Sequence, residues 1–283
     1  MRNGWSRRSW IKVAAGAPLL RFGGLAPEIA NAGLEPGNLG RVPEPWPAEQ
    51  TRIEPVADFF PTQAPELVRE MVTVSHFDLK RVKELVEARP SLAKASWDWG
   101  FGDWESALGA ASHMGNRAIA TYLIEKGAAP SLFSAAMLGD LEVVKALVAA
   151  QPGVQRISGP HSISLLAHAK AGGEKSHAIF EFLQSLGDAD AAPAVPLSES
   201  EAAALTGAYV FGIGTSQSIE VSVERGQVTW TRRGMMGRPL VHLGEHVFYP
   251  CGAVAARIRF VGEGAGMTMT VSDPETVLVA KRK

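Results

Sequence analysis

The sequence of 283 residues contains one cysteine, Cys251. One chain therefore cannot form an internal disulfide, nor a zinc site built on cysteines. The net charge at pH 7 is only −1, and no strong excess of Lys and Arg marks a surface for nucleic acid. The G-x-S-x-G motif of many serine hydrolases is also missing. These absences argue against a disulfide-stabilised scaffold, a nucleic-acid-binding protein and a hydrolase of that class.

Apolar residues, in contrast, are plentiful: 46% of the chain is hydrophobic and 20% is charged. This composition is sufficient for one or two buried cores, because domains contain about 50 to 250 residues. We therefore expect an α plus β protein of two domains that is held together by packing.

Residues 1–32 have the features of an export signal. The stretch Ser6-Arg7-Arg8-Ser9-Trp10-Ile11-Lys12 precedes small and apolar residues, and Ala30-Asn31-Ala32 offers a small-x-small cleavage pattern. This segment resembles a twin-arginine signal peptide, which implies that export machinery recognises Arg7 and Arg8 and that the mature protein is periplasmic or extracellular. Residues 13–26 are too short and too rich in glycine for a membrane span, which needs about 20 apolar residues. The alternative is a disordered basic N-terminus of a cytosolic protein.

Residues 33–65 are expected to form an extended linker. They hold seven of the 18 prolines, and proline disfavours both isolated helices and central strands. Phe59 and Phe60, near the end of this segment, are candidates for a cap over the apolar end of the domain that follows.

Between residues 66 and 190 the chain repeats a common pattern. In three segments a leucine precedes a glycine by seven positions: Leu108 and Gly115, Leu132 and Gly139, and Leu165 and Gly172. The second and third glycines lie 33 residues apart, which is the period of ankyrin repeats. A weaker first unit has Phe77 in place of the glycine and brings the expected number of repeats to four.

This pattern resembles that of an ankyrin-repeat protein, which implies an α-solenoid of about four repeats over residues 66–190. The T-P-L-H signature of that family is missing, since Gly109, Phe133 and Leu166 stand where its histidine belongs. The spacings are also unequal, with 38 residues from Phe77 to Gly115 and 24 from Gly115 to Gly139. The first connection is therefore long, and the second lacks room for a hairpin finger.

A second linker over residues 191–204 precedes a segment of short alternating runs. Ile219, Val221 and Val223 alternate with polar residues, and residues 224–227 then supply a turn. Similar runs over residues 205–283 bring the number of expected strands to about eight. This number favours a small antiparallel β-barrel or sandwich.

Three stretches of this segment, LTGAYVF, IEVSVERGQV and ARIRFVGEGAGMTMTV, follow one another in the chain. In this order they resemble the lipocalin-like β-domain that is appended to serine β-lactamase-like hydrolases. The resemblance implies the fold of the segment but no catalytic residue, because the hydrolase core that usually precedes such a domain is missing. An eight-stranded barrel is large enough to hold one small ligand.

The stretch SWDWGFGDWESALG, residues 96–109, concentrates aromatic side chains within the long first connection. The candidate partner-binding residues here are Trp97, Trp99, Phe101, Trp104, Asp98 and Asp103. One interpretation is an exposed aromatic anchor for a peptide or sugar beside the two aspartates. The other is packing, in which the rings cover helices that the missing finger leaves bare.

No metal site or cofactor is expected from the sequence. His242-Leu243-Gly244-Glu245-His246 matches the H-x-x-E-H pattern of some zinc peptidases, but that pattern requires a helix, and here two strands are expected to meet at a turn. The histidines at positions 76, 113, 161, 168 and 177 are scattered over the repeats and are expected to lie at the surface or at helix caps.

These observations favour a non-catalytic, exported ankyrin-repeat scaffold that binds a protein partner in the bacterial cell envelope. Two alternatives remain open: an accessory or regulatory subunit of a periplasmic hydrolase, and a carrier that holds a small apolar ligand in the β-domain.

Overall fold

A computed structural model describes residues 57–190, 194–212, 217–274 and 276–283. Arg7 and Arg8, and most of the predicted proline-rich linker, lie outside the described residues, so the export signal stays a prediction. Within the described residues, no helix combines the length and the apolar character that a membrane crossing requires.

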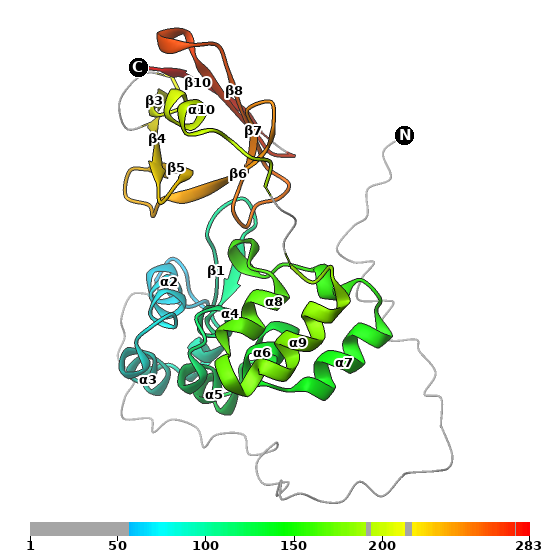
Figure 1. The fold of residues 1–283 in the computed structure, drawn as a ribbon. Helices are drawn as coiled ribbons and strands as arrows, with labels where there is room; N and C mark the ends of the chain where they lie inside the picture. Colours follow the sequence, from blue (N-terminus) through cyan, green and yellow to red (C-terminus); the bar gives the residue numbers. More distant parts are fainter. Residues whose placement is uncertain (1–56, 191–193, 213–216, 275) are drawn as a thin grey trace, which may run out of the picture. The chain divides into compact units, whose positions relative to one another are not determined.

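Residues 65–186 are mainly helical (Figure 1). The α-helices of this part are α2 (Pro65–Val74), α3 (Leu79–Ala88), α4 (Ala107–His113), α5 (Arg117–Glu125), α6 (Leu132–Leu138), α7 (Leu141–Ala150), α8 (Leu165–Ala171) and α9 (His177–Leu186). Between them lie a hairpin of β1 (Ser96–Asp98) and β2 (Trp104–Ser106) and the short 3-10 helices η2 (Pro90–Lys94), η3 (Val154–Arg156), η4 (Pro160–Ser162) and η5 (Gly173–Ser176).

Side-chain caps explain where several of these helices begin. Ser106, Ser131 and Ser164 each accept a hydrogen bond from the backbone N–H three residues later, at the starts of α4, α6 and α8. Asp78 accepts the equivalent hydrogen bond at the start of α3. Because these helices have only 7 to 10 residues, packing between helices must supply most of their stability.

Small side chains bring the helices close together. Helix α4 packs against α2 and α6, and α6 packs against α8. Ala110, Ala111 and Ala136 are fully buried in these contacts. The buried residues form two clusters, one mainly from α2 to α5 with Met137 of α6, and the other from α6 to α9.

The prediction of an ankyrin-type solenoid is wrong, because the helices are not arranged as a stack of equivalent units. The connections differ from one another: one is the β1–β2 hairpin, the next is a short turn at residues 126–131, and the third contains η3 and η4. The buried residues also form two clusters rather than the continuous core that stacked repeats share. The missing T-P-L-H signature and the unequal spacings are the sequence features that accompany this irregularity.

Glycines end two of the helices with different surroundings. Gly139 ends α6 with a φ of 92°, and Gly187 ends α9 with a φ of 79°. A Cβ at Gly139 would collide with the carbonyl oxygen of Lys175, whereas a Cβ at Gly187 would meet no atom within 4 Å. Both glycines therefore have a left-handed backbone, but only Gly139 lies close to the backbone of another segment, at Lys175.

We expect Gly139→Ala to destabilise the protein more than Gly187→Ala. Both variants force alanine into the left-handed region, at a cost of about 1 kcal/mol. Only Gly139→Ala adds the collision with Lys175, which should cost about 1 to 3 kcal/mol more. Denaturant unfolding of the two variants measures the difference, and equal losses would show that the helix pairs are not in close contact at Gly139.

The C-terminal part is a closed antiparallel barrel of eight strands, which confirms the predicted strands and decides between barrel and sandwich. Its strands follow the order β10-β3-β4-β5-β6-β7-β8-β9 around the barrel. They are β3 (Gly207–Val210), β4 (Ser218–Glu224), β5 (Gln227–Arg232), β6 (Arg238–Gly244), β7 (Val247–Pro250), β8 (Arg257–Val261), β9 (Thr268–Ser272) and β10 (Val277–Arg282).

Alternation along the strands produces the barrel core. In β8, Ile258 and Phe260 are buried, whereas Arg257, Arg259 and Val261 are exposed. The segment expected to be a plain linker also has structure of its own, because α10 (Glu199–Ala204) begins at a capping box between the side chains of residues 198 and 201.

Candidate functional site

The Trp-rich stretch forms the β1–β2 hairpin and its loop. Ser96 pairs with Ser106 and Asp98 with Trp104, so residues 99–103 make the turn. Gly100, Phe101 and Gly102 all have positive φ values, of 114°, 55° and 78°. A left-handed backbone is strained at a phenylalanine, so surrounding contacts must hold this loop in place.

The six candidate residues of this stretch do not form one surface. Trp97 and Trp99 pack against the first helical core cluster, whereas Trp104 is 64% exposed. Phe101 stacks on Trp230 of the barrel with ring centroids 5.7 Å apart. The packing interpretation thus holds for Trp97 and Trp99, whereas Trp104 has the exposure that the anchor interpretation requires.

The two aspartates also have separate roles. Asp98 accepts a hydrogen bond of 2.8 Å from the backbone N–H of Gly100 within the turn. Asp103 is buried and forms an ion pair with Arg238 of β6. Asp103 also accepts hydrogen bonds of 2.9 Å from the backbone N–H and from Nδ1 of His161.

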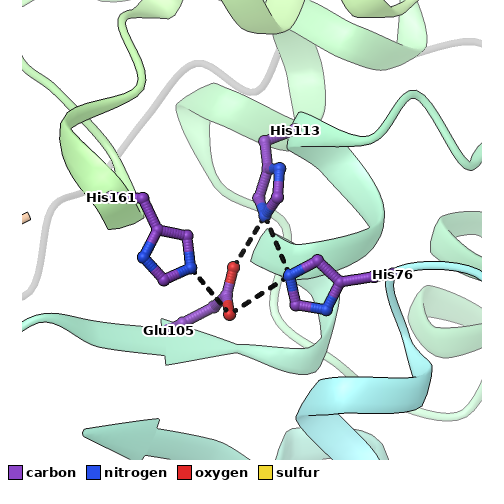
Figure 2. Close-up of side chains that lie close together, drawn as sticks. All are labelled: His76, Glu105, His113 and His161. Atoms are coloured by element: carbon purple, nitrogen blue, oxygen red, sulfur yellow. Dashed lines mark hydrogen bonds and ion pairs between the residues drawn. The ribbon is translucent and has the colours of Figure 1, made fainter. Parts of the chain in front are cut away.

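Glu105, two residues after Asp103, lies at the centre of a cluster that the sequence did not reveal. Its side chain is fully buried on β2, and three histidines from separate segments surround it (Figure 2). Nε2 of His113 lies 2.9 Å from Oε1 of Glu105. Nε2 of His76 and Nε2 of His161 lie 3.5 and 3.4 Å from Oε2.

Each histidine reaches Glu105 from a different element. His76 lies in the turn after α2, His113 is the last residue of α4, and His161 lies in η4 with a φ of 57°. The η4 backbone is anchored because the Cys251 thiol donates to the carbonyl oxygen of His161 and Gly252 N–H donates to the Ser162 hydroxyl. The folding of the hairpin against the helices therefore assembles the cluster.

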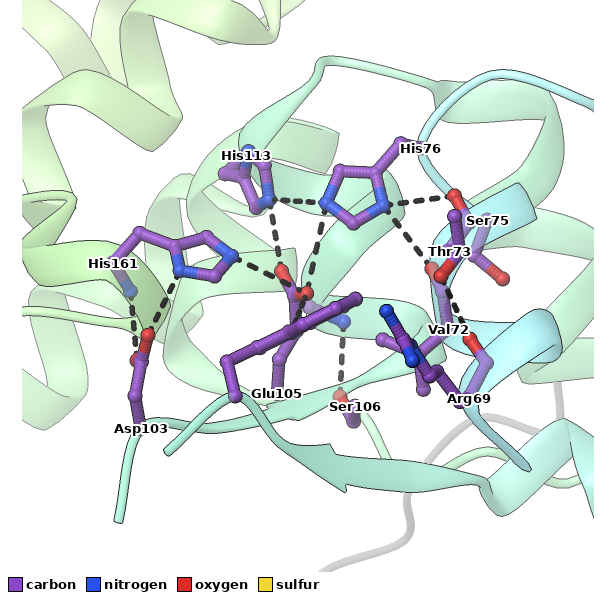
Figure 3. A network of polar contacts seen from close by, with 12 residues as sticks. Arg69, Val72, Thr73, Ser75, His76, Asp103, Glu105, Ser106, His113 and His161 are labelled. Carbon is purple, nitrogen blue, oxygen red and sulfur yellow. Dashed lines mark hydrogen bonds and ion pairs between the residues drawn. The ribbon is translucent and has the colours of Figure 1, made fainter. Parts of the chain in front are cut away.

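Acceptors around the rings determine which nitrogen carries hydrogen. Nδ1 of His76 faces the carbonyl oxygens of Val72 and Thr73 at 3.1 and 3.0 Å, and Nδ1 of His161 faces the carboxylate of Asp103 (Figure 3). Because these oxygens can only accept, both Nδ1 atoms must be protonated. In each neutral ring the Nε2 lone pair then points toward Glu105 and is available to a cation.

The charges of the cluster are strongly coupled. Burial alone would raise the pKa of Glu105. Hydrogen bonds from His113 and His161, followed by the charges of His161 and His76, lower it instead to about 2. Burial would lower the pKa of His161, but hydrogen bonds to Asp103 and Glu105 and their negative charges raise it to about 9. In the metal-free protein, a protonated His161 thus neutralises the buried Glu105.

His76 and Asp103 shift in the directions that their surroundings predict. Burial lowers the pKa of His76, and the charge of Glu105 opposes this effect only in part. Burial would raise the pKa of Asp103, but hydrogen bonds from His161, followed by the charges of His161 and Arg238, lower it. His76 is therefore ready to supply a neutral ring nitrogen.

The spacing of the four ligand atoms suits a metal ion. One ligand atom of each residue lies within 4.8 Å of all the others, and Nε2 of His76 and His113 are 3.2 Å apart. In a tetrahedral zinc site with bonds of about 2.0 to 2.1 Å, neighbouring ligand atoms are about 3.4 Å apart. The distance between Nε2 of His76 and Nε2 of His113 is close to that value, as are the distances from Oε2 of Glu105 to Nε2 of His161, 3.4 Å, and of His76, 3.5 Å.

The comparisons find no family model, no curated protein and no solved structure that matches this chain. The resemblance of the β-domain to lipocalin-like domains therefore stays a prediction, and no match supports the ankyrin resemblance, whose solenoid the fold already contradicts. The function has to be argued from the geometry of the site.

The expectation that the histidines are scattered surface or capping residues is wrong for four of them, three of which share one cluster. His76, His113 and His161 lie together on Glu105, although 85 positions separate the first from the last. His168 is also buried, and its Nδ1 donates to the carbonyl oxygen of Ser164. His177, in contrast, is exposed and contacts Glu181 one turn along α9.

One signal in the sequence could have found Glu105. Residues 103–105 alternate as Asp-Trp-Glu, and in a strand the two acidic side chains share one face, opposite the tryptophan. Trp104 is exposed and both acidic side chains are buried, as this alternation requires. The three histidines carry no such signal, because only the tertiary fold brings their segments together.

Two other motifs have the structural context of turns or surface helices. His242 pairs with Phe248 within β6, and Glu245 and His246 form the turn to β7 with positive φ, as the sequence predicted for H-x-x-E-H. Ser91 and Lys94 also match S-x-x-K, a nucleophile motif of serine hydrolases. They lie in the exposed part of η2, where the Ser91 hydroxyl accepts from Gln63 Nε2 at 2.8 Å.

The stability of the metal-free protein should depend on pH in two directions. The pKa of Glu105 falls from 4.5 to about 2 on folding, so its contribution is present above pH 4.5 and is lost as the pH falls toward 2. The pKa of His161 rises from 6.5 to about 9, so its contribution is present below pH 6.5 and is lost as the pH rises toward 9. We expect the free energy of unfolding to be largest between about pH 4.5 and 6.5.

Glu105→Gln should flatten the acidic side of this profile and cost about 3 kcal/mol at pH 6, because it removes one partner of a buried ion pair. Urea unfolding in the presence of a chelator, from pH 2.5 to 9, measures both effects. Glu181→Gln is the matched control, because Glu181 is exposed and pairs with the exposed His177. An unchanged acidic slope in Glu105→Gln would contradict the assigned charge of Glu105.

Proposed function

We propose that this protein binds a divalent transition metal of the zinc class at His76, Glu105, His113 and His161. The observation that carries the proposal is the convergence of three imidazole Nε2 atoms on a fully buried carboxylate, with the four ligand atoms within 4.8 Å of one another. Imidazole nitrogens with a carboxylate oxygen are a common ligand set for zinc, iron, nickel and copper.

Electrostatics favour a cation at the centre of this cluster. Nε2 of His76 and Nε2 of His113 are only 3.2 Å apart, so two neutral rings with facing lone pairs would repel each other there. A hydrogen on Nε2 of His113 or a metal ion between the two rings removes this repulsion. A divalent metal neutralises Glu105 and accepts the lone pairs of all three rings at once, which protons on separate rings do not.

The surroundings of the histidines also resemble a metal centre. Metal-bound histidines usually donate their second ring N–H to a carboxylate or a backbone carbonyl, which fixes the ring and makes the other nitrogen a better ligand. His161 has the carboxylate of Asp103 in this role, and His76 has the carbonyl oxygens of Val72 and Thr73 (Figure 3). Trp99 Nε1 donates to Oε2 of Glu105 at 2.7 Å and orients the carboxylate.

A metal at this position would link four segments: the end of α2, strand β2, helix α4 and η4. Binding to the folded state alone stabilises a protein by about 2.7 kcal/mol when the metal concentration is 100 times the dissociation constant. The site is reached from the side of His161 and His76, whose side chains are 25% and 19% exposed, compared with 6% for His113.

The scaffold hypothesis receives less support from the geometry than metal binding does. Trp97 and Trp99 pack against the helical core, and Asp103 is buried in an ion pair, so they are not presented together to a protein partner. The predicted location in the cell envelope is independent of the metal and rests on the signal-peptide features of residues 1–32.

The metal proposal predicts one zinc per chain. Elemental analysis after dialysis should find about one equivalent in the wild type and little in His76→Ala or His113→Ala. Addition of zinc to chelator-treated wild type should raise the melting temperature by several degrees, about 2 to 4 °C for each kcal/mol of binding stabilisation. Cobalt provides a second measurement, because its visible absorption reports a tetrahedral nitrogen and oxygen ligand set.

His177→Ala is the matched control, because His177 is exposed on α9 and should leave metal content unchanged. Circular dichroism identifies any variant that fails to fold. If folded wild type takes up neither zinc nor cobalt, the cluster is an ion-pair network held by protons, and the metal proposal is wrong.

A further inference from the structure

A cavity of about 850 Å³ lies beside the histidine cluster, between the Trp-rich loop and the end of the barrel. It has the size of sites for small organic molecules, which range from about 300 to 1,000 Å³. His161 belongs both to the wall of this cavity and to the candidate metal ligands.

Aromatic rings form much of the wall. Trp97, Trp99 and Phe101 line it from the hairpin, and Trp230 lines it from β5. Such rings offer large flat surfaces to another ring at little cost in conformational entropy. The cavity is therefore shaped for a flat apolar group.

The loop that presents Phe101 is fixed by specific contacts. Arg238 donates through Nη1 to the carbonyl oxygen of Gly100 at 3.1 Å and forms an ion pair with Asp103. Phe101 lies with its ring stacked on Trp230 at an interplanar angle of 21°. These contacts hold a phenylalanine in a left-handed conformation, which is an arrangement that costs free energy and is characteristic of binding sites.

The charges on the wall are predominantly positive. Arg69, Arg232 and Arg238 line the cavity, against the single carboxylate of Asp98. Arg238 is neutralised by Asp103, whereas no described residue forms an ion pair with Arg69 or Arg232. The remaining positive charge complements a molecule with one negative group.

We propose that this cavity binds a small aromatic monoanion, such as an aryl carboxylate, with its ring among the aromatic side chains and its carboxylate toward Arg232 and Arg69. Met235 and Met236, which line the same cavity and are 50% and 74% exposed, provide flexible apolar surface at its edge. The inference rests on the proposed function in one respect only: through His161, the bound molecule would lie next to the metal.

The experiment uses 2-naphthoate as the probe and isothermal titration calorimetry as the readout. The wild type should bind one equivalent with a dissociation constant on the order of 0.1 mM. Arg232→Gln should weaken binding about tenfold, because it removes the charged hydrogen bond that the guanidinium donates to the carboxylate of the probe. Arg233→Gln is the matched control: Arg233 is the next residue, is exposed and does not line the cavity.

A second pair of variants tests the aromatic wall. Phe101→Ala should weaken 2-naphthoate binding about fivefold, because it removes an aromatic contact. Trp104→Ala should leave binding unchanged, because Trp104 lies on the same hairpin but outside this cavity. The neutral analogue 2-naphthylmethanol should bind about tenfold more weakly than 2-naphthoate. Equal binding of the two probes, or equal effects of Arg232→Gln and Arg233→Gln, would overturn the proposal.

Titrations of the chelator-treated and the zinc-loaded wild type separate the two proposals. Binding of 2-naphthoate to a protein that takes up no zinc would refute the metal site and support the cavity. Zinc uptake without 2-naphthoate binding in either form would refute the cavity and leave the metal site standing.

Discussion

The arrangement around the Trp-rich hairpin depends on one buried carboxylate. Glu105 has no contact with solvent, and an isolated carboxylate in such a position would cost several kcal/mol. Its oxygens therefore require donors, and the structure supplies Trp99 Nε1 and the Nε2 atoms of His113 and His161. These donors come from the β1–β2 loop, α4 and η4, and the ring of His76, after α2, lies against the same carboxylate. Four segments therefore meet at one side chain.

A second carboxylate extends this network to the barrel. Asp103 accepts from His161 and pairs with Arg238 of β6, so the same hydrogen-bonded chain runs from Glu105 through His161 and Asp103 to a barrel strand. Arg238 also holds the carbonyl oxygen of Gly100, which fixes the loop that carries Phe101. The geometry of the cluster and the shape of the aromatic cavity consequently depend on the same ion pair.

The barrel was predictable from the sequence and the helical arrangement was not. Ile258 and Phe260 alternate with charged residues, and this local pattern both identifies a strand and shows which face is buried. The leucine and glycine spacings also report local structure correctly, since Gly139 does end a helix. How the helices stack depends on connections such as the turn at residues 126–131 and the stretch with η3 and η4, and a repeat period measured at two glycines does not determine those.

The candidate site was missed for a related reason. The tryptophans of the hairpin made it a candidate site in the sequence. The residue at the centre of the cluster, however, is Glu105, which lies between Trp104 and the start of α4. The sequence does not distinguish a histidine at the surface from a histidine that faces a buried carboxylate, because the difference lies in the residue that the ring contacts in the fold. His76, His113 and His161 have that partner because the chain folds back on β2 three times.

The same contacts determine what can occupy the centre of the cluster. His161 is held by Asp103 on one side and Glu105 on the other, and these carboxylates raise its pKa to about 9. A metal ion must therefore displace a proton that is well bound near neutral pH, and it gains in return a charged oxygen and three nitrogen ligands that are already in position. A metal ion would thus compete with protons for the lone pairs of the three histidines and Glu105. These lone pairs are held in place by four segments, which distinguishes the cluster from an ordinary buried ion pair.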